Sequence, residues 1–179
     1  MEQKEKHQAT KAKKQGMLKE FFGNQLKEML YIENKSLELM QEMEENCYTE
    51  ELEDAINEHR HQTEKQVKRL KKCFRLIEVE PEEKKSVIID NLLNESQAIL
   101  KEASNSSRSK DALIIIAAQK LEHFEIAMYN GLIQLALTMG KEDVAELLEK
   151  NYHEEYDSEC LLNSIGEEKL FIEDEESQT

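Results

Sequence analysis

Glutamates occupy positions where apolar side chains are expected in the segment from Ile115 to Met139. Residues spaced three and four apart in this segment would share one helix face, and they read Ile115, Ala118, Glu122, Glu125, Tyr129, Leu132, Ala136 and Met139. A buried carboxylate without a partner costs several kcal/mol, or it takes up a proton and becomes neutral. Glu122 and Glu125 therefore predict a compensating partner, which could be a metal ion, a paired cation or a hydrogen-bond network.

Three other amphipathic segments repeat this pattern of apolar ends and a polar middle. Their central residues on the apolar face are Glu33, His59, Thr63, Gln66, Glu155 and Glu159, and a shorter segment adds Glu95. The long segments have comparable lengths, so their midpoints can lie at one height when the helices pack together. The simplest arrangement places these side chains in one polar layer across one core.

Such a layer has the chemistry of a metal site. Carboxylates with an imidazole suit iron, manganese or zinc. The candidate metal ligands are Glu33, His59, Glu122, Glu125, Glu155 and Glu159. The alternative is a buried network without metal that fixes the register of the helices at a cost in stability.

The remaining polar residues near these positions are weaker candidates. Glu95 is expected to act as a cap or an outer partner rather than a ligand. Glu58-x-x-His61 has the spacing of a ligand pair but falls on a lysine-rich, solvated face. His123 and His153 are also expected to face solvent. Tyr129, one turn after Glu125, is expected to belong to the core or to hydrogen-bond that carboxylate.

Five helices are predicted to position the polar layer. The chain has 5 Gly, 1 Pro and no Trp, a shortage of turn formers that favours long helices over sheet. The predicted helices span about 17–45, 49–78, 81–103, 110–139 and 141–165, with Thr49 as the N-cap of the second and Pro81 in the first turn of the third. The third helix is predicted to bury Ile88, Leu92, Glu95 and Ile99.

Loop lengths predict how the helices pack. Short loops make the first and second helices antiparallel, and likewise the fourth and fifth, so the short third helix carries the chain between two hairpins. We therefore predict an all-α fold, a ferritin-like four-helix bundle with one long crossover that contains a short fifth helix. Residues 17–166 would form this bundle, preceded by a disordered basic arm (1–16) and followed by an acidic tail (167–179).

Composition excludes several classes of function. The net charge of −15 argues against nucleic acid and against docking on an anionic membrane. No apolar run is long enough to span a bilayer, and the N-terminus lacks the apolar core of a signal peptide. Three scattered cysteines indicate reduced thiols, so we expect a cytoplasmic protein. The sequence contains no phosphate-binding loop, nucleophile–base triad or Cys-x-x-Cys pair.

Several of these residues also carry a family resemblance. The run Asp111-Ala-Leu-Ile-Ile-Ile-Ala-Ala-Gln-Lys-Leu-Glu-His-Phe-Glu-Ile-Ala-Met-Tyr129 closely resembles a signature of the YciE/YciF-like bacterial proteins. Tyr31-Ile-Glu33-Asn-Lys35, His59-x-x-x-Thr63-x-x-Gln66-x-x-x-Leu70 and Glu154-Glu155 also resemble this family. The resemblance covers roughly residues 18–165. It implies a ferritin-like bundle, usually a homodimer, associated with bacterial stress and with an inferred di-metal centre of iron or manganese.

The chain departs from the family pattern at three positions. Gln62 and Asp90 stand where the family usually has Glu, and Glu159 stands where it usually has Asp. The amide at position 62 removes one charge and one potential bridging ligand. The resemblance therefore leaves a full di-metal centre, a single metal and a metal-free site as alternatives.

Three hypotheses about function follow. The first is a non-haem di-metal protein that meets oxygen or peroxide. The second is a metal-free structural or interaction dimer, which Gln62 favours. The third, an iron-storage cage, ranks below both because the sequence shows no feature of a large shell assembly.

Overall fold

The chain forms five helices in the computed structural model, which describes residues 2–102 and 108–169. The helices are α1 (Glu2–Glu44), α2 (Glu50–Ile77), α3 (Val87–Glu102), α4 (Arg108–Thr138) and α5 (Glu142–Lys169). No strand occurs among the described residues. The predicted all-α class is confirmed.

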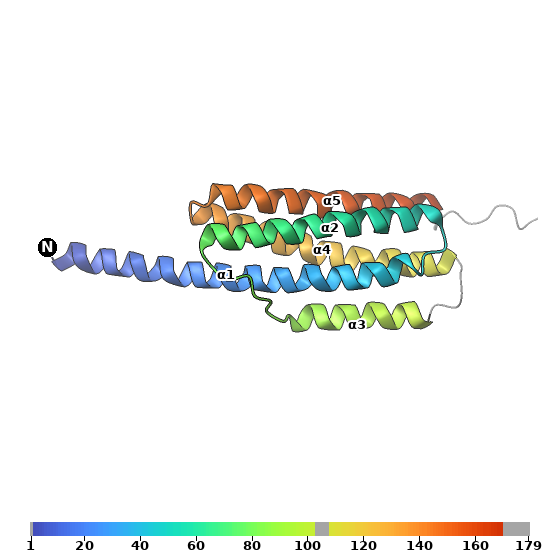
Figure 1. The fold of residues 1–179 in the computed structure, drawn as a ribbon, viewed down its shortest axis with the longest axis horizontal. Helices are drawn as coiled ribbons and strands as arrows, with labels where there is room; N and C mark the ends of the chain where they lie inside the picture. The colour runs from blue at the N-terminus through green and yellow to red at the C-terminus, as the bar shows by residue number, and fades with distance from the viewer. Residues whose placement is uncertain (1, 103–107, 170–179) are drawn as a thin grey trace, which may run out of the picture.

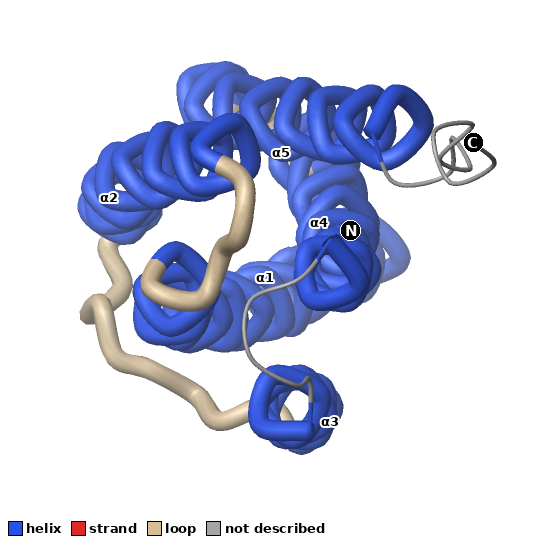
Figure 2. Tube along the Cα trace, turned by 90° about the vertical axis from the view of Figure 1, so that its right-hand side faces the viewer, coloured by secondary structure: helices blue, strands red, loops and turns tan. Residues whose placement is uncertain are grey.

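Four of the helices form a bundle, and the fifth lies outside it. Viewed end-on, α1, α2, α5 and α4 stand at the corners of a square, and α3 lies outside along α1 (Figure 2). The neighbouring pairs are α1 with α2, α2 with α5, α5 with α4, and α4 with α1, while α3 contacts α1 and α4. This is the predicted ferritin-like bundle with a long crossover, and α1 extends beyond it at its N-terminal end (Figure 1).

The helix ends follow local sequence. Between α4 and α5, Gly140 adopts a left-handed conformation (φ 67°), which glycine tolerates without steric cost. After α2, Glu78 adopts the same region (φ 56°), and the last turn is closed by hydrogen bonds from Glu78 N–H to Arg75 O and from Val79 N–H to Phe74 O. Thr49 occupies the N-cap position of α2, but its side chain makes no cap hydrogen bond there.

The first helix begins earlier than predicted. The sequence predicts a disordered arm over residues 1–16, whereas α1 begins at Glu2. Lys, Gln, Glu and Ala make up most of this segment, and all of them favour helix, so one continuous helix is consistent with local propensity. The C-terminal boundary also shifts, because α5 continues to Lys169. The rest of the predicted acidic tail lies outside the described residues.

The crossover differs from the prediction in two ways. Pro81 does not open a helix, because residues 79–86 are irregular and α3 begins only at Val87. This segment is bonded to the first helix through Lys84 N–H and Lys27 O, 3.1 Å apart. The buried face of α3 is also one residue away from the predicted one. It consists of Ile89, Leu93, Ser96 and Leu100, and the predicted Ile88 is 64 % exposed.

The predicted core of the long helices is largely correct. In α2, all eight residues of the predicted face are buried: Leu52, Ile56, His59, Thr63, Gln66, Leu70, Phe74 and Ile77. In α4, the same holds from Ile115 to Ala136, with Met139 half-buried. Apolar layers therefore enclose the polar one from both ends. No described helix contains an apolar stretch that could cross a bilayer.

Candidate metal centre

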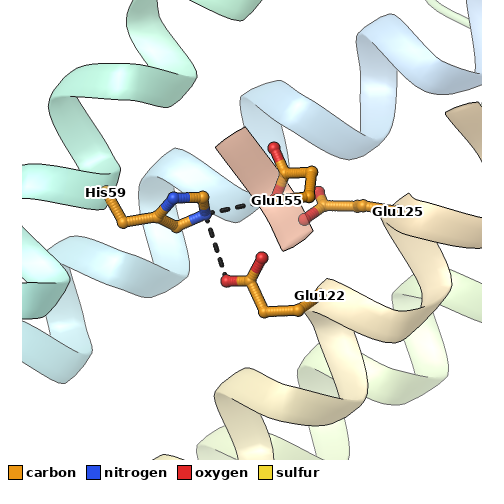
Figure 3. Close-up of side chains that lie close together, drawn as sticks. All are labelled: His59, Glu122, Glu125 and Glu155. Atoms are coloured by element: carbon orange, nitrogen blue, oxygen red, sulfur yellow. Dashed lines mark ion pairs between the residues drawn. The ribbon is translucent and has the colours of Figure 1, made fainter. Parts of the chain in front are cut away.

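The polar layer brings together four ionisable side chains from three helices. His59 comes from α2, Glu122 and Glu125 come from successive turns of α4, and Glu155 comes from α5. One potential ligand atom from each lies within 4.8 Å of the others, and all four residues are buried. In Figure 3 the His59 imidazole points at the carboxylates of Glu122 and Glu155. Four of the six predicted ligands are therefore close enough together to bind one cation.

The orientation of the His59 ring suits a ligand. Its Nε2 is 3.1 Å from Oε1 of Glu122 and 3.3 Å from Oε2 of Glu155. On the other side of the ring, Nδ1 lies 3.3 Å from Oε1 of Gln62. An amide oxygen only accepts hydrogen bonds, so Nδ1 carries a hydrogen and Nε2 faces the carboxylates. Nε2 can hold a proton shared with those carboxylates, or it can offer its lone pair to a cation.

Several carboxylate oxygens in the layer have no partner. Within the described chain, no hydrogen bond reaches Oε2 of Glu33, Oε2 of Glu122 or Oε1 of Glu155, and all three atoms are buried. Oε2 of Glu155 faces Nε2 of His59 at 3.3 Å. Buried polar atoms in proteins are nearly always paired. These unpaired oxygens are therefore candidate ligands for a cation.

Two serines support the carboxylates of α4. Ser36 of α1, fully buried, donates from Oγ to Oε1 of Glu125 over 2.6 Å. Ser158 of α5 donates from Oγ to Oε1 of Glu122 over 3.3 Å. Each bond leaves the second oxygen of its carboxylate for another partner. Hydrogen bonds of this kind orient carboxylates around metals.

The fifth predicted ligand, Glu33 of α1, lies beside this group. Its Oε1 accepts a hydrogen bond from the hydroxyl of Tyr129 on α4, and the charges of Glu125 and Glu155 act on it. All four bundle helices thus contribute a buried ionisable group to the layer. Tyr129 belongs to the core, as expected, but its partner is Glu33 and not Glu125.

The layer keeps protons when no metal is bound. Burial raises the pKa of Glu125 and that of Glu155 to about 8, and repulsion from neighbouring carboxylates adds to this effect. Burial raises the pKa of Glu33 well above its usual range. Burial alone would lower the pKa of His59, but the adjacent Glu122 and Glu155 raise it well above the ordinary value. A cation entering the layer would displace these protons.

The sixth predicted ligand does not join the group. Glu159 is half-buried on α5 and lies outside the set of mutually close ligand atoms. The position that faces the layer on that turn belongs to Ser158, through its bond to Glu122. Glu95 is exposed and pairs with Lys120 over 2.7 Å, so it is not in the layer.

Three further histidines face solvent, as the sequence predicts. His61, His123 and His153 are exposed. Sequence reasoning missed Ser36 and Ser158, because a serine on a helix face carries no distinctive pattern. Their only signal is position, since each lies three residues after a predicted ligand.

The departures from the family pattern lie at different distances from the centre. Gln62 touches the ring of His59 from outside, so the substitution there changes the partner of a candidate ligand. Asp90 lies on α3 and accepts a hydrogen bond from the hydroxyl of Tyr31 on α1, away from the layer. The Asp90 departure therefore concerns how the crossover attaches and not the candidate site.

Comparison with known families supports this architecture. A family model described as a domain of unknown function (DUF892) matches residues 17–171. The chain belongs to the DUF892 family. Among curated relatives, Protein YciF of Escherichia coli (strain K12) is 31 % identical over 121 residues, which cover 65 % of this chain and 70 % of YciF.

Solved structures agree with this assignment to the DUF892 family. The crystal structure of the E. coli stress protein YciF matches with a TM-score of 0.78 and 26 % identity, and it covers 83 % of this chain and 93 % of that chain. YcfI of Rhodopseudomonas palustris, described as a candidate structural protein, matches with a TM-score of 0.79 and 28 % identity, over 82 % and 93 % of the two chains. The resemblance to YciF-like proteins noted in the sequence is confirmed.

Proposed function

We propose that the polar layer holds a di-metal centre of iron or manganese. The observation that carries this proposal is the set of buried carboxylate oxygens without partners beside the Nε2 atom of His59. A protein that only used these groups for structure would be expected to satisfy them with hydrogen bonds. Carboxylate and imidazole donors together suit these two metals.

The charges of the layer favour two ions over one. Glu33, Glu122, Glu125 and Glu155 carry four negative charges when ionised, and two divalent cations would balance them while His59 stays neutral. A single divalent cation would leave two carboxylates uncompensated, and these would have to keep protons. Glu33, His59, Glu122, Glu125 and Glu155 are the proposed ligands, and Glu159 stays a predicted ligand outside this set.

When bound, such a centre supplies one- and two-electron chemistry with oxygen or peroxide. The chain contributes a dry site between apolar layers, serines that orient two carboxylates, and Gln62 that fixes the tautomer of His59. The E. coli relative YciF is called a stress protein. A role in oxidative stress, as a cytoplasmic homodimer, is consistent with that relationship and with this chemistry.

A metal-free structural dimer is the second candidate function. Two points favour it: Gln62 stands where the resemblance implies a carboxylate, and YcfI is described in structural terms. In this case the layer would hold its protons permanently, and the raised pKa values of Glu125 and Glu155 would describe the working state. Stability, and not metal content, would then respond to substitutions in the layer.

Elemental analysis of the native protein distinguishes the two functions. We expect about one to two iron or manganese ions per chain, by analogy with other two-metal sites, in protein expressed with each metal. Glu122→Ala should remove most of this metal, whereas Glu95→Ala, which changes an exposed carboxylate, should leave it in place. Wild-type protein that stays free of metal even after anaerobic iron loading would reject the di-metal centre and leave the structural dimer.

A further inference from the structure

A line of hydrogen bonds connects the protein surface to Glu33 and uses all four helices of the bundle. Arg69 of α2 donates from Nη1 to Oδ1 of Asn151 on α5 over 3.0 Å. Asn151 donates from Nδ2 to the hydroxyl of Tyr129 on α4 over 2.8 Å. Tyr129 in turn donates to Oε1 of Glu33 on α1. We call these four residues the polar chain.

The direction of the polar chain is fixed by its surroundings. Arg69 can only donate, so Asn151 must present its oxygen to it. The amide nitrogen of Asn151 therefore faces Tyr129, and it also lies 3.4 Å from the main-chain oxygen of Gln66, which can only accept. With the Tyr129 oxygen already accepting from Asn151, its proton is left for Glu33. Every member donates to the next, and the last acceptor is a carboxylate.

The outer end of the polar chain is anchored by an ion pair. Arg69 Nη1 and Nη2 contact the two oxygens of Glu154 at 2.6 and 2.7 Å, a forked arrangement that fixes the guanidinium plane. The inner three residues, Asn151, Tyr129 and Glu33, are fully buried. A cation at the surface is thus connected to a carboxylate at the centre through buried, hydrogen-bonded groups.

We propose that Arg69 is a positioning residue that acts through the polar chain to hold the Glu33 carboxylate in place for a divalent cation. This inference rests on the proposed di-metal centre. The polar chain gives Oε1 of Glu33 a hydrogen-bond donor and leaves Oε2 without a partner. It therefore selects Oε2 as the oxygen that is offered to the metal. It is not a route for protons, because a guanidinium does not give up a proton in proteins.

The molecule supplies a matched control for Arg69. Arg60, also on α2, forms an ion pair with Glu44 of α1 over 2.9 Å. The side chains of Arg60 and Glu44 are 24 % and 22 % exposed, and those of Arg69 and Glu154 are 22 % and 24 % exposed. Both pairs join two helices, but among the described residues the ionic contacts of Arg60 are with Glu44 and Glu64, outside the polar layer. Arg60→Gln therefore removes an equivalent ion pair without breaking the polar chain.

The test is a titration of the full-length protein with Mn²⁺, with free ion followed by its electron paramagnetic resonance signal, and a parallel anaerobic series with Fe²⁺. We expect Arg69→Gln to weaken metal binding by about tenfold or more, which is typical when an outer partner of a metal ligand is lost. Arg60→Gln should weaken metal binding by less than about twofold. Arg69→Lys keeps the charge but cannot form the fork, so it should fall between them and serves if Arg69→Gln folds poorly.

A double-mutant cycle separates positioning from a general loss of stability. If Arg69 acts through Tyr129, the Arg69→Gln, Tyr129→Phe double variant should bind metal no more weakly than Tyr129→Phe alone. Equal affinities of Arg69→Gln and Arg60→Gln, or additive losses in the double variant, would overturn this inference while the metal centre stands. A wild-type protein that binds neither ion would overturn both the centre and the inference.

Discussion

Two parts of this molecule bury carboxylates, and they treat them in opposite ways. Asp111, in the first turn of α4, is 1 % exposed and accepts three hydrogen bonds at the α1–α2 turn. Tyr48 N–H donates to Oδ1 over 2.7 Å, and Thr49 donates to Oδ2 from its N–H over 3.0 Å and from its hydroxyl over 2.6 Å. In the polar layer, Oε1 of the buried Glu155 has no hydrogen-bond partner, and Oε2 faces Nε2 of His59 at 3.3 Å.

The difference separates a structural carboxylate from a candidate ligand. At Asp111 the fold brings three hydrogen-bond donors from the α1–α2 turn to one carboxylate, so both of its oxygens are paired. At Glu155 it supplies the His59 ring and three repelling carboxylates, those of Glu33, Glu122 and Glu125. We therefore interpret the missing donors in the layer as space for cations, and the following predictions test this contrast from the largest effect to the smallest.

Glu155→Gln should have the largest effect on metal affinity and should change the stability of the metal-free protein little. The amide has the size of a protonated glutamate, and Glu155 holds its proton at neutral pH because burial raises its pKa to about 8. Unfolding of metal-free protein in urea at pH 7 should therefore be unchanged or shifted to higher urea. Metal affinity should fall by about 100-fold, since a ligand charge is lost. Unchanged metal affinity would remove Glu155 from the site.

Asp111→Ala should show the reverse pattern. Loss of three hydrogen bonds to a charged acceptor, each contributing about 1.5–3 kcal/mol and not fully additive, should lower the free energy of unfolding by about 3 kcal/mol. Metal content should stay at the wild-type level. Asp143→Ala is the control, because Asp143 lies in the first turn of α5 but is exposed and bonds only to the adjacent Val144 N–H. A variant that folds normally but loses metal would contradict the assignment of Asp111 as structural.

Stability of the metal-free protein should decrease as pH rises from 6 to 8.5. The folded-state pKa values of Glu125 and Glu155 are about 8, far above those of carboxyls in an unfolded chain, so the folded state binds more protons across this range. The raised pKa of His59 acts in the same direction, because its stabilisation is present below the ordinary histidine pKa and is lost as pH rises through the folded value.

Urea midpoints at the two pH values, measured with chelator and with Mn²⁺, check this prediction. Mn²⁺ should flatten or reverse the slope, since metal binds the deprotonated ligands and binds more tightly as pH rises. Glu155→Gln should reduce the slope without metal. Stability that rises with pH in chelator would show that the carboxylates of the layer are ionised and compensated in another way.

Gln62→Glu should have the smallest effect, an increase in metal affinity of up to about tenfold. A carboxylate at this position would accept the Nδ1–H of His59 more strongly than the amide does and make Nε2 a better ligand. Gln62→Ala should weaken binding by a similar factor. If Glu at position 62 is required for any binding in a Mn²⁺ titration, the wild-type layer has lost its metal and the structural alternative gains support.

Much of this fold follows from the spacing of apolar residues. The long helices have one apolar face each, so the bundle and the buried positions of Glu33, His59, Glu122, Glu125 and Glu155 could be predicted before the structure was known. Periodicity fails where two faces are similar. In α3, Ile88 with Leu92 and Ile89 with Leu93 are equally apolar, and only packing against α1 and α4 selects the second pair.

The choice of positions on α5 involves a related ambiguity. A helix turns once in 3.6 residues, so steps of three and of four both keep a residue near one face. Glu159 was predicted on a step of four from Glu155, whereas Ser158, on a step of three, reaches Glu122. Asn151, four residues before Glu155, is fully buried on the same face. The polar chain is beyond periodicity altogether, because it depends on the relative heights of four helices.

The contacts of Asp111 also affect the order in which the molecule can fold. The turn between α1 and α2 leaves main-chain N–H groups at Tyr48 and Thr49 that are satisfied from a residue more than sixty positions later in the chain. Neither the first hairpin nor the start of α4 is therefore complete alone. The two halves should gain most of their structure in a single concerted step, and an isolated peptide of residues 17–78 should populate its hairpin only weakly.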